Sequence, residues 1–287
     1  MPGAAAPILI HNPCVPSDLP IGVFDSGVGG LTVLRALRER LPAESLIYLG
    51  DTARLPYGTK SVESVVRYAT QATDYLVRRG VKLLVVACNT ASAVSIDPLR
   101  DRFAPLPVIG VVEPGAEAAV AASRRQHHLV LATESTVKRH AYARAIHALA
   151  PDAHVDELPC SMFVALAEEG WTDGAIPEAI AHEYLDGAMH PAGSPAPDTV
   201  VLGCTHFPLL AGAIRAVVGS GPTIVDSATT TAARVADVLA RSGLDTTRTG
   251  RGTLTLLATD GPDRFARVGA RFLGEPIQPA DVEVIDL

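Results

Sequence analysis

Two cysteines stand in matching settings in the two halves of the chain. The stretches are VVACNT at 85–90 and VLGCTH at 201–206, each an apolar run, a small residue, a cysteine and two hydrogen-bonding residues. In a parallel α/β sheet, functional side chains gather where strands end and loops begin. Two strand ends, one from each half, can therefore place Cys88 and Cys204 on opposite sides of a cleft. Such a pair of thiols can remove a proton from one face of a carbon and return one to the other face, which is the chemistry of a two-base racemase.

The settings of the two cysteines also favour reactive sulfur. A thiol reacts as its thiolate, and helix N-termini or cationic neighbours stabilise that form. Both Cys88 and Cys204 lie just before predicted helices. A single cysteine after an apolar strand is ordinarily a small buried side chain. Two cysteines in matching contexts, each followed by polar residues, favour a functional interpretation instead.

Two other interpretations of Cys204 stay open at this point. His206 lies two residues further on, which allows a cysteine nucleophile with a histidine base if both lie in a loop. Cys204, His206 and a carboxylate could also bind a metal ion, although that ligand set is incomplete and its spacing is unusual for zinc. The four cysteines form no C-x-x-C pair, which disfavours a zinc knuckle or a redox dithiol.

A glycine-rich loop, DSGVGG at 25–30, follows the first predicted strand and precedes a helix that begins at Leu31. Glycines allow a ligand to approach the backbone, and a helix N-terminus attracts an anion. Because the loop does not read G-x-G-x-x-G, a substrate carboxylate is a better expectation than a dinucleotide. Asp25 at the strand end could act on a neighbouring thiol, or it could simply cap the helix.

Polar side chains near the two cysteines could bind an amino acid. The carboxylate and ammonium groups of such a substrate need hydrogen-bond partners once they leave water. The candidates are Asn89, Thr90, Thr133, Thr136, Thr205 and His206. Each could also be a helix cap, a role that is compatible with ligand binding.

Pyridoxal phosphate is not expected as a cofactor. An enzyme that uses it needs a lysine for the Schiff base. Lys82 begins a predicted strand, at the end of the sheet away from the expected site, and neither Lys60 nor Lys138 has a phosphate-binding motif nearby. We therefore expect no pyridoxal phosphate.

The composition indicates a globular protein in a reducing compartment. Hydrophobic residues make up 48% of the chain, enough for a large core. The net charge is −7 without a cluster of Lys and Arg, which argues against direct nucleic-acid binding. No apolar run reaches membrane-spanning length, and the N-terminus lacks the basic residues of a signal peptide. We expect a cytoplasmic protein with reduced thiols, in which neither Cys14 nor Cys160 is essential and Cys160 lies in the core.

Strands and helices alternate along the chain, which is the signature of parallel α/β sheets. The expected strands are 21–24, 45–49, 82–87, 108–112, 128–132, 155–158, 199–203, 223–225 and 253–258. The expected helices are 31–41, 62–79, 89–102 with an interruption at Pro98, 114–125, 137–149, 163–169, 177–189, 208–218, 230–241 and 262–273.

The similar pattern around each cysteine predicts two similar domains, each a mostly parallel sheet flanked by helices. The active site is then expected in the interdomain cleft. The first predicted domain combines 21–112 with 225–287, the second is 113–224, and 1–20 is a flexible extension.

Four stretches closely resemble glutamate racemases: GVFDSGVGGLTVLR at 22–35, YLGDTARLPYG at 48–58, VVACNTAS at 85–92 and LGCTHFPLL at 202–210. Weaker matches are TESTVKRHAY at 133–142, CSMFVALAEEG at 160–170 and VDSA at 225–228. The matches follow the family's order from about residue 21 to the C-terminus. The chain departs from the family's usual Gly at Ser135 and from its usual Pro at Ser161 and Ala165.

The resemblance implies a cofactor-independent racemase that supplies D-glutamate for peptidoglycan. By motif position, Cys88 resembles the base for D-glutamate, assisted by Asp25. Cys204 resembles the base for L-glutamate, assisted by His206 and Glu168. The residues that the resemblance places against the substrate are Asp25, Ser26, Tyr57, Gly58, Asn89, Thr90, Thr136, Thr205 and His206.

The resemblance also implies a homodimer and leaves alternatives for the function. An aspartate racemase of the same superfamily is the nearest one, because one sequence does not reveal the length of the substrate side chain. A cysteine amidase that uses Cys204 and His206 leaves the matching context of Cys88 unexplained. Some relatives are said to inhibit DNA gyrase, so a gyrase-binding protein is the third alternative.

Overall fold

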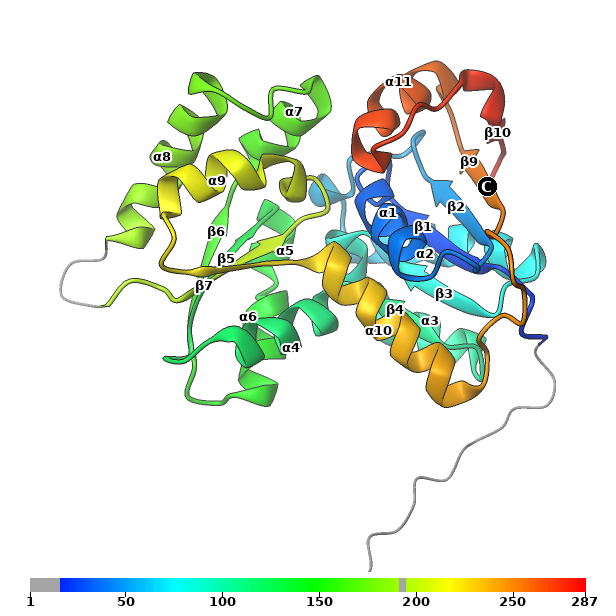
Figure 1. Cartoon of the computed structure of the whole chain (residues 1–287), viewed down its shortest axis with the longest axis horizontal. Helices are drawn as coiled ribbons and strands as arrows, with labels where there is room; N and C mark the ends of the chain where they lie inside the picture. The colour runs from blue at the N-terminus through cyan, green and yellow to red at the C-terminus, as the bar shows by residue number, and fades with distance from the viewer. Residues whose placement is uncertain (1–15, 191–194) are drawn as a thin grey trace, which may run out of the picture.

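The computed structural model describes residues 16–190 and 195–287 and contains two parallel sheets, each flanked by helices (Figure 1). Cys14 and most of the predicted extension lie outside the described residues, as do residues 191–194. At the described end of the extension, Asp18 accepts a hydrogen bond from Thr246, and the carbonyl oxygen of Ser17 accepts one from Lys82.

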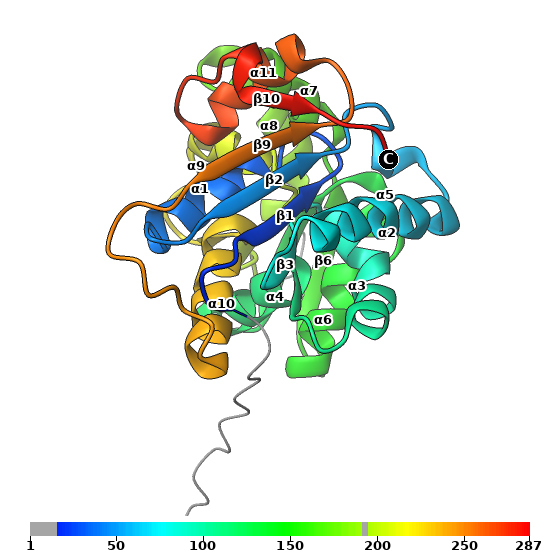
Figure 2. The same cartoon turned by 90° about the vertical axis from the view of Figure 1, so that its right-hand side faces the viewer.

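The larger sheet has six parallel strands in the order β10-β9-β2-β1-β3-β4. Figure 2 shows β10, β9, β2, β1 and β3 side by side. The strands are β1 Ile21–Asp25, β2 Leu46–Gly50, β3 Leu83–Val86, β4 Val108–Gly110, β9 Leu254–Ala258 and β10 Val282–Val284. The central strands are nearly continuous apolar runs, as parallel strands covered on both faces require. One face packs on α1 Leu31–Arg40, α10 Ser227–Ser242 and α11 Pro262–Leu273, and the other on α2 Val62–Arg78 and α3 Asn89–Phe103.

The smaller sheet has four parallel strands in the order β6-β5-β7-β8. They are β5 His127–Ala132, β6 His154–Pro159, β7 Thr199–Gly203 and β8 Thr223–Asp226. One face packs on α7 Ser161–Glu169, α8 Ala175–Met189 and α9 Ala211–Val218, and the other on α4 Val112–Ala122 and α6 Ala141–Leu149. The predicted α/β class, with mostly parallel sheets flanked by helices, is confirmed.

After β8 the chain returns to the larger sheet. The helix α10 packs against α1, and β9 then pairs with β2. The predicted domain division at 113 and 225 stays a prediction, and its second boundary falls within β8, which pairs with β7. In the parts of the chain that are described, no helix combines the length and the apolar character needed to cross a membrane.

Helix boundaries differ from the prediction around residue 140. The expected helix at 137–149 is two helices, α5 Glu134–Lys138 and α6, because His140 adopts a left-handed backbone with φ 49°. A residue in that region cannot continue the α-helical hydrogen-bond pattern. The helix α5 begins immediately after Thr133, at the carboxyl end of β5.

Two further predictions about helices are wrong. Pro98 lies inside α3 and does not interrupt it. Proline lacks an N–H, so the helix loses one backbone hydrogen bond there, but the burial of the neighbouring Leu99 in the core offsets that loss. The helix expected from Pro208 starts as a short 3₁₀ helix, η2 Phe207–Leu210, before α9. Consequently no α-helix begins directly after Cys204, and the two cysteines differ in this respect.

The carboxyl ends of the strands deliver the predicted site. Asp25 is the last residue of β1, Cys88 follows β3, and Cys204 follows β7. Lys82 lies at the opposite end of the larger sheet, as predicted, where it is fully buried and pairs with Glu44 at 2.6 Å.

Candidate active site

Both cysteines line one cavity between the two sheets. It has a volume of about 280 Å³ and takes side chains from both halves of the chain. The predicted site residues on its wall are Ser26, Tyr57, Gly58, Cys88, Asn89, Thr90, Glu168, Cys204, Thr205 and His206. Another cavity of about 400 Å³ lies between α3, α4 and α6, but no cysteine or histidine lines it. The reactive groups therefore single out the smaller cavity as the candidate site.

The sulfur of Cys88 is held by the start of α3 and by the glycine-rich loop. Cys88 is the N-cap of α3, where the Ala91 N–H points at Sγ at 3.5 Å, and the Ser26 hydroxyl lies 3.3 Å from the same sulfur. Burial and the nearby charge of Asp25 raise the pKa of Cys88 to about 12, although the Ser26 and Ala91 hydrogen bonds oppose that rise. At neutral pH, Cys88 is a thiol.

Asp25 lies behind the cavity wall. Only 2% of it is exposed, and its Oδ2 accepts hydrogen bonds from the Gly27 N–H at 2.9 Å and the Tyr48 hydroxyl at 3.2 Å. Burial raises the pKa of this carboxyl group, while backbone donors lower it. Ser26, the next residue, is the one that contacts Cys88. Asp25 thus affects the Cys88 sulfur in two ways. Its charge lies nearby, and its hydrogen bond to Gly27 holds the loop from which Ser26 contacts that sulfur.

Cys204 has a different environment, in which His206 lies between the cysteine sulfur and the carboxylate of Glu168. The Nδ1 atom of His206 lies 3.8 Å from Cys204 Sγ, and Nε2 lies 3.1 Å from Glu168 Oε1. Burial alone lowers the pKa of His206, but hydrogen bonds with Cys204 and Glu168 outweigh it and raise that pKa to about 10. The hydrogen bond from His206, against the effect of burial, lowers the pKa of Glu168 to about 2.

The two sulfurs therefore face opposite charges. The His206 imidazole lies 3.8 Å from Cys204 Sγ, whereas the charge of Asp25 lies near Cys88 and helps to raise the pKa of that thiol. Two sulfurs on one cavity with partners of opposite charge are suited to two different roles in a proton transfer.

The same geometry disfavours a metal ion at Cys204. His206 directs Nδ1 to Cys204 and Nε2 to Glu168, so the sulfur and the carboxylate lie on opposite edges of its ring. Ligands of one ion must converge on a point about 2 Å from each of them. These three groups do not converge, and they serve instead as a relay of hydrogen bonds.

The helix α11, from the larger-sheet half, supports this relay. Arg264 donates a hydrogen bond to Glu168 Oε2 at 2.7 Å, and Arg271 donates one to the Glu168 carbonyl oxygen at 2.7 Å. The Phe272 ring lies edge-on to His206, with ring centroids 5.0 Å apart. Sequence reasoning missed all three residues, because arginines on an amphipathic helix look like an ordinary solvent-facing surface and Phe272 looks like an ordinary core residue.

The glycine-rich loop packs directly on the loop that carries Cys204. A Cβ atom on Gly29 would lie 2.4 Å from the His206 ring and 2.5 Å from Thr205 Oγ1. Thr32 of α1 donates a hydrogen bond to the Thr205 carbonyl oxygen at 2.9 Å. The glycine thus allows the two halves to approach, a role that its sequence motif did not reveal.

Asn89 offers an unused donor at the cavity wall. It is 3% exposed, and its Oδ1 accepts a hydrogen bond from the Tyr142 hydroxyl at 2.7 Å. Its Nδ2 has no partner among the described residues. Buried polar groups are nearly always paired, so this amide indicates a ligand that brings an acceptor such as a carboxylate.

Three threonines form a chain of hydroxyl groups across the halves. Thr90 Oγ1 lies 3.2 Å from Thr133 Oγ1, which lies 3.1 Å from Thr136 Oγ1. Thr133 lines the cavity, whereas Thr136 is fully buried behind it. Of the predicted contacts, Asp25 and Thr136 are therefore the two that lie outside the cavity wall.

Tyr57 contributes its ring rather than a free hydroxyl. It is 1% exposed, and its hydroxyl donates a hydrogen bond to Asp51. The candidate Thr133 lines the cavity, and the lining residues that had not been predicted as contacts are Gly27, Val28, Leu55, Pro56, Thr59, Glu134, Ser161 and Val164. Most of these are apolar or are neighbours of predicted residues, so no chemical pattern singled them out.

Comparison with known proteins identifies similar chains. Residues 21–235 match the family model described as Asp/Glu/hydantoin racemase. A glutamate racemase of Geobacter metallireducens is 48% identical over 254 residues, which cover 88% of this chain and 92% of that protein. The helix α11 lies beyond the stretch that matches the family model.

Solved structures agree with this match. Glutamate racemase from Thermus thermophilus in complex with β-chloro-D-alanine has a TM-score of 0.83 and 42% identity, covering 95% of this chain and 98% of that one. Glutamate racemase from Francisella tularensis in complex with D-glutamate has a TM-score of 0.85 and 34% identity, covering 94% and 98%.

Proposed function

Because the chain belongs to the Asp/Glu/hydantoin racemase family, we propose that it interconverts L-glutamate and D-glutamate. The observation that carries the proposal is the pair Cys88 and Cys204 on one cavity, with partners of opposite charge. The relatives described above are named glutamate racemases, which supports glutamate over aspartate as the substrate.

The proton movements follow from the two environments. The Cys204 thiolate takes the α-proton of L-glutamate, and the electron pair of that C–H bond stays on the α-carbon and its carboxylate. The Cys88 thiol then gives its proton to the opposite face, which leaves D-glutamate, a Cys204 thiol and a Cys88 thiolate. D-glutamate reacts by the same steps in reverse, with Cys88 as the base.

The α-proton of an amino acid is weakly acidic, so the site must stabilise the developing negative charge. Preorganised donors aimed at that charge are the largest contribution an active site can make. The free Nδ2 of Asn89 and the hydroxyls of Ser26, Thr90 and Thr205 are the available donors on the wall. We assign the substrate carboxylates to them.

The two assisting systems have distinct roles in this proposal. His206 is the cation that stabilises the Cys204 thiolate, and Glu168 fixes the orientation and charge of its ring. The negative charge of Asp25, which lies behind Ser26, keeps Cys88 protonated until Cys88 donates its proton to the substrate.

Because each sulfur must be free to hold a proton, we also propose that the protein is located in a reducing compartment, the cytoplasm. The product D-glutamate would serve peptidoglycan synthesis, and the assembly would be a homodimer.

The test is turnover by purified protein that has been treated with a chelator and receives no cofactor. D-glutamate and D-aspartate are supplied separately, and formation of the L-enantiomer is followed by chiral chromatography. The proposal predicts conversion of glutamate to an equal mixture and a far lower rate with aspartate. Ammonia release from glutamine without racemisation would favour an amidase, and inert glutamate would contradict the proposal.

A further inference from the structure

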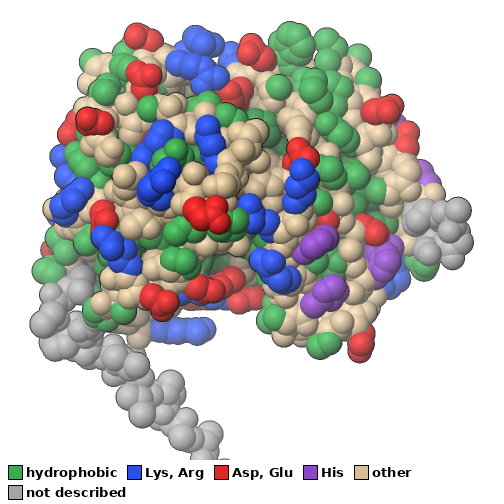
Figure 3. All heavy atoms as spheres, turned by 180° about the vertical axis from the view of Figure 1, so that it is seen from behind, with side chains coloured by type: hydrophobic (Ala, Val, Ile, Leu, Met, Phe, Trp, Pro, Cys, Tyr) green, Lys and Arg blue, Asp and Glu red, His purple; other side chains and the backbone are tan. Residues whose placement is uncertain are grey.

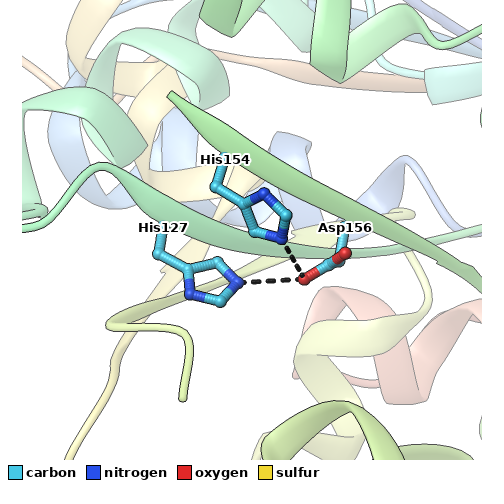
Figure 4. Close-up of side chains that lie close together, drawn as sticks. All are labelled: His127, His154 and Asp156. Carbon is cyan, nitrogen blue, oxygen red and sulfur yellow. Dashed lines mark hydrogen bonds and ion pairs between the residues drawn. The ribbon is translucent and has the colours of Figure 1, made fainter. Parts of the chain in front are cut away.

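A second group of chemically capable side chains lies at the other end of the smaller sheet. His127 is the first residue of β5, while His154 and Asp156 are the first and third residues of β6 (Figure 4). The active site lies beyond the carboxyl ends of the strands, so this group is at the amino ends. Histidine side chains also gather on the face seen in Figure 3, over this half of the molecule.

The strand register brings the three side chains together. His127 and His154 are direct partners across the parallel β5–β6 pair. Asp156 is two residues further along β6, and side chains two apart on a strand point to the same face. Hydrogen bonds from His154 N to Gln126 O at 2.7 Å and from Asp198 N to His127 O at 3.0 Å hold both histidine backbones.

The donor atoms converge on a common point. Asp156 Oδ2 lies 2.9 Å from His127 Nε2 and 3.3 Å from His154 Nε2, and all three ligand atoms lie within 4.8 Å of one another. In a tetrahedral zinc site with bonds of about 2.0–2.2 Å, neighbouring ligand atoms are about 3.3–3.6 Å apart. The observed spacing needs only small side-chain rotations to surround an ion.

We propose that His127, His154 and Asp156 bind one divalent transition-metal ion of the zinc class, which clamps β6 to β5. Two imidazole nitrogens and a carboxylate suit Zn²⁺, Co²⁺ or Ni²⁺, whereas Mg²⁺ and Ca²⁺ prefer all-oxygen sites. The strand β6 is the edge of the smaller sheet and pairs only with β5 in the described structure. An ion with ligands on both strands would therefore tie down the least supported strand.

The exposure of the three side chains gives an ion access to the group. The side chain of His127 is 9% exposed, that of Asp156 46% and that of His154 65%. An ion can enter from solvent and take a water molecule as its fourth ligand. No residue of the group lines the catalytic cavity, so the proposal does not depend on the racemase reaction.

The chain provides a matched control. His182 Nδ1 lies 3.0 Å from Asp186 Oδ1 on α8, and both side chains are more than half exposed. This pair offers one imidazole and one carboxylate without a third ligand. Substitution of His182 therefore shows how much a single histidine–carboxylate pair contributes to zinc binding.

The experiment measures Zn²⁺ binding by calorimetry in Cys88→Ser/Cys204→Ser protein, because the cavity thiols can bind zinc themselves. We expect one ion per chain, with affinity reduced at least about ten-fold in His154→Ala and Asp156→Asn and unchanged in His182→Ala. Tetrahedral d–d absorption of added Co²⁺ should be lost in the same two variants. Zinc binding of unchanged affinity in His154→Ala, or no binding at all, would overturn the proposal.

A second measurement uses the same Cys88→Ser/Cys204→Ser protein. Zn²⁺ at about one hundred times its Kd should raise the Tm of this protein by about 5 °C, while Mg²⁺ should not. Adding His154→Ala should abolish that rise, and His154→Ala in the wild-type chain should keep its basal racemase activity. An equal rise in His154→Ala would place the ion elsewhere and contradict the assignment.

Discussion

Arg264 on α11 donates a hydrogen bond at 2.7 Å to Glu168 on α7, so a helix of the larger-sheet half holds the carboxylate that orients His206. The contact joins residues from the two sides of the cavity. It also places α11, which lies beyond the stretch matched by the family model, among the elements that shape the candidate site. The first prediction tests whether this contact matters for the reaction.

The variant Arg264→Gln should lower kcat/KM by about two- to five-fold in both directions. The effect is modest because Arg264 is about half exposed, and ion pairs of that kind contribute about 1 kcal/mol or less. The loss must be equal for the two enantiomers, since their equilibrium constant is fixed at one. Arg264→Lys should recover part of the rate. Arg267→Gln, on the exposed side of the same helix, is the control, and an equal loss there would show a general effect on α11.

The Glu168–His206 pair should make stability depend on pH in a defined way. The pKa of His206 is raised from 6.5 to about 10, so its contribution is complete below pH 6.5 and disappears as the pH rises through 10. The pKa of Glu168 is lowered from 4.5 to about 2, so its contribution is complete above pH 4.5 and disappears as the pH falls through 2.

Denaturant unfolding of the wild type and Glu168→Gln across this range checks the prediction. The difference in unfolding free energy should be largest between about pH 4.5 and 6.5 and should shrink toward pH 10. Glu169→Gln, at the next and exposed position, should show no such profile. A difference that stays constant with pH would mean that the two groups are not coupled.

Gly29→Ala should abolish most activity without unfolding the chain. The added methyl group would lie 2.4 Å from the His206 ring, which must then move away from Cys204. The backbone of Gly29 is not among the positive-φ glycines of the chain, so the effect is steric. Gly187→Ala, where a Cβ atom meets nothing within 4 Å, is the matched control. Circular dichroism and turnover of both variants decide the matter, and a fully active Gly29→Ala would refute the packing argument.

Cys88→Ala and Cys204→Ala should each lower racemisation by about 10²-fold or more, because each removes one of two proton carriers. Cys88→Ala retains the base for L-glutamate and should still exchange the α-proton of that enantiomer with solvent. Cys204→Ala should show the complementary exchange with D-glutamate. Cys160→Ala, in the core behind Cys204, is the control and should keep its activity. Near-normal racemisation by either cavity variant would exclude the two-thiol mechanism.

The positions of Cys88, Cys204 and Asp25 could be predicted because parallel strands give a recognisable pattern and deliver their final residues to one edge. The burial of Asp25 behind Ser26 could not, because it depends on how tightly the loop at 25–30 folds. Thr136 illustrates the same limit. Both Thr133 and Thr136 were predictable as hydroxyl groups near a strand end, but only Thr133, which directly precedes α5, lines the cavity.

Contacts between distant segments were beyond the reach of the sequence. Arg264 and Glu168 are 96 positions apart, and nothing in an amphipathic helix indicates which exposed arginine meets a partner. The pairing of Tyr142 with Asn89 depends in the same way on how the two sheets face each other. The short strand β10 also lacked a signal, since its three residues alternate too briefly to indicate a strand.

The most direct test of the central claim is the fate of deuterium during the reaction of D-glutamate in D₂O. If separate sulfurs remove and return the proton, the L-glutamate formed early carries deuterium at Cα, while the recovered D-glutamate keeps its protium. The two enantiomers are separated at low conversion, and NMR then gives the deuterium content at Cα of each. Comparable deuterium in the two enantiomers from the start would show that one group handles both faces, and the assignment of Cys88 and Cys204 as opposed bases would be wrong.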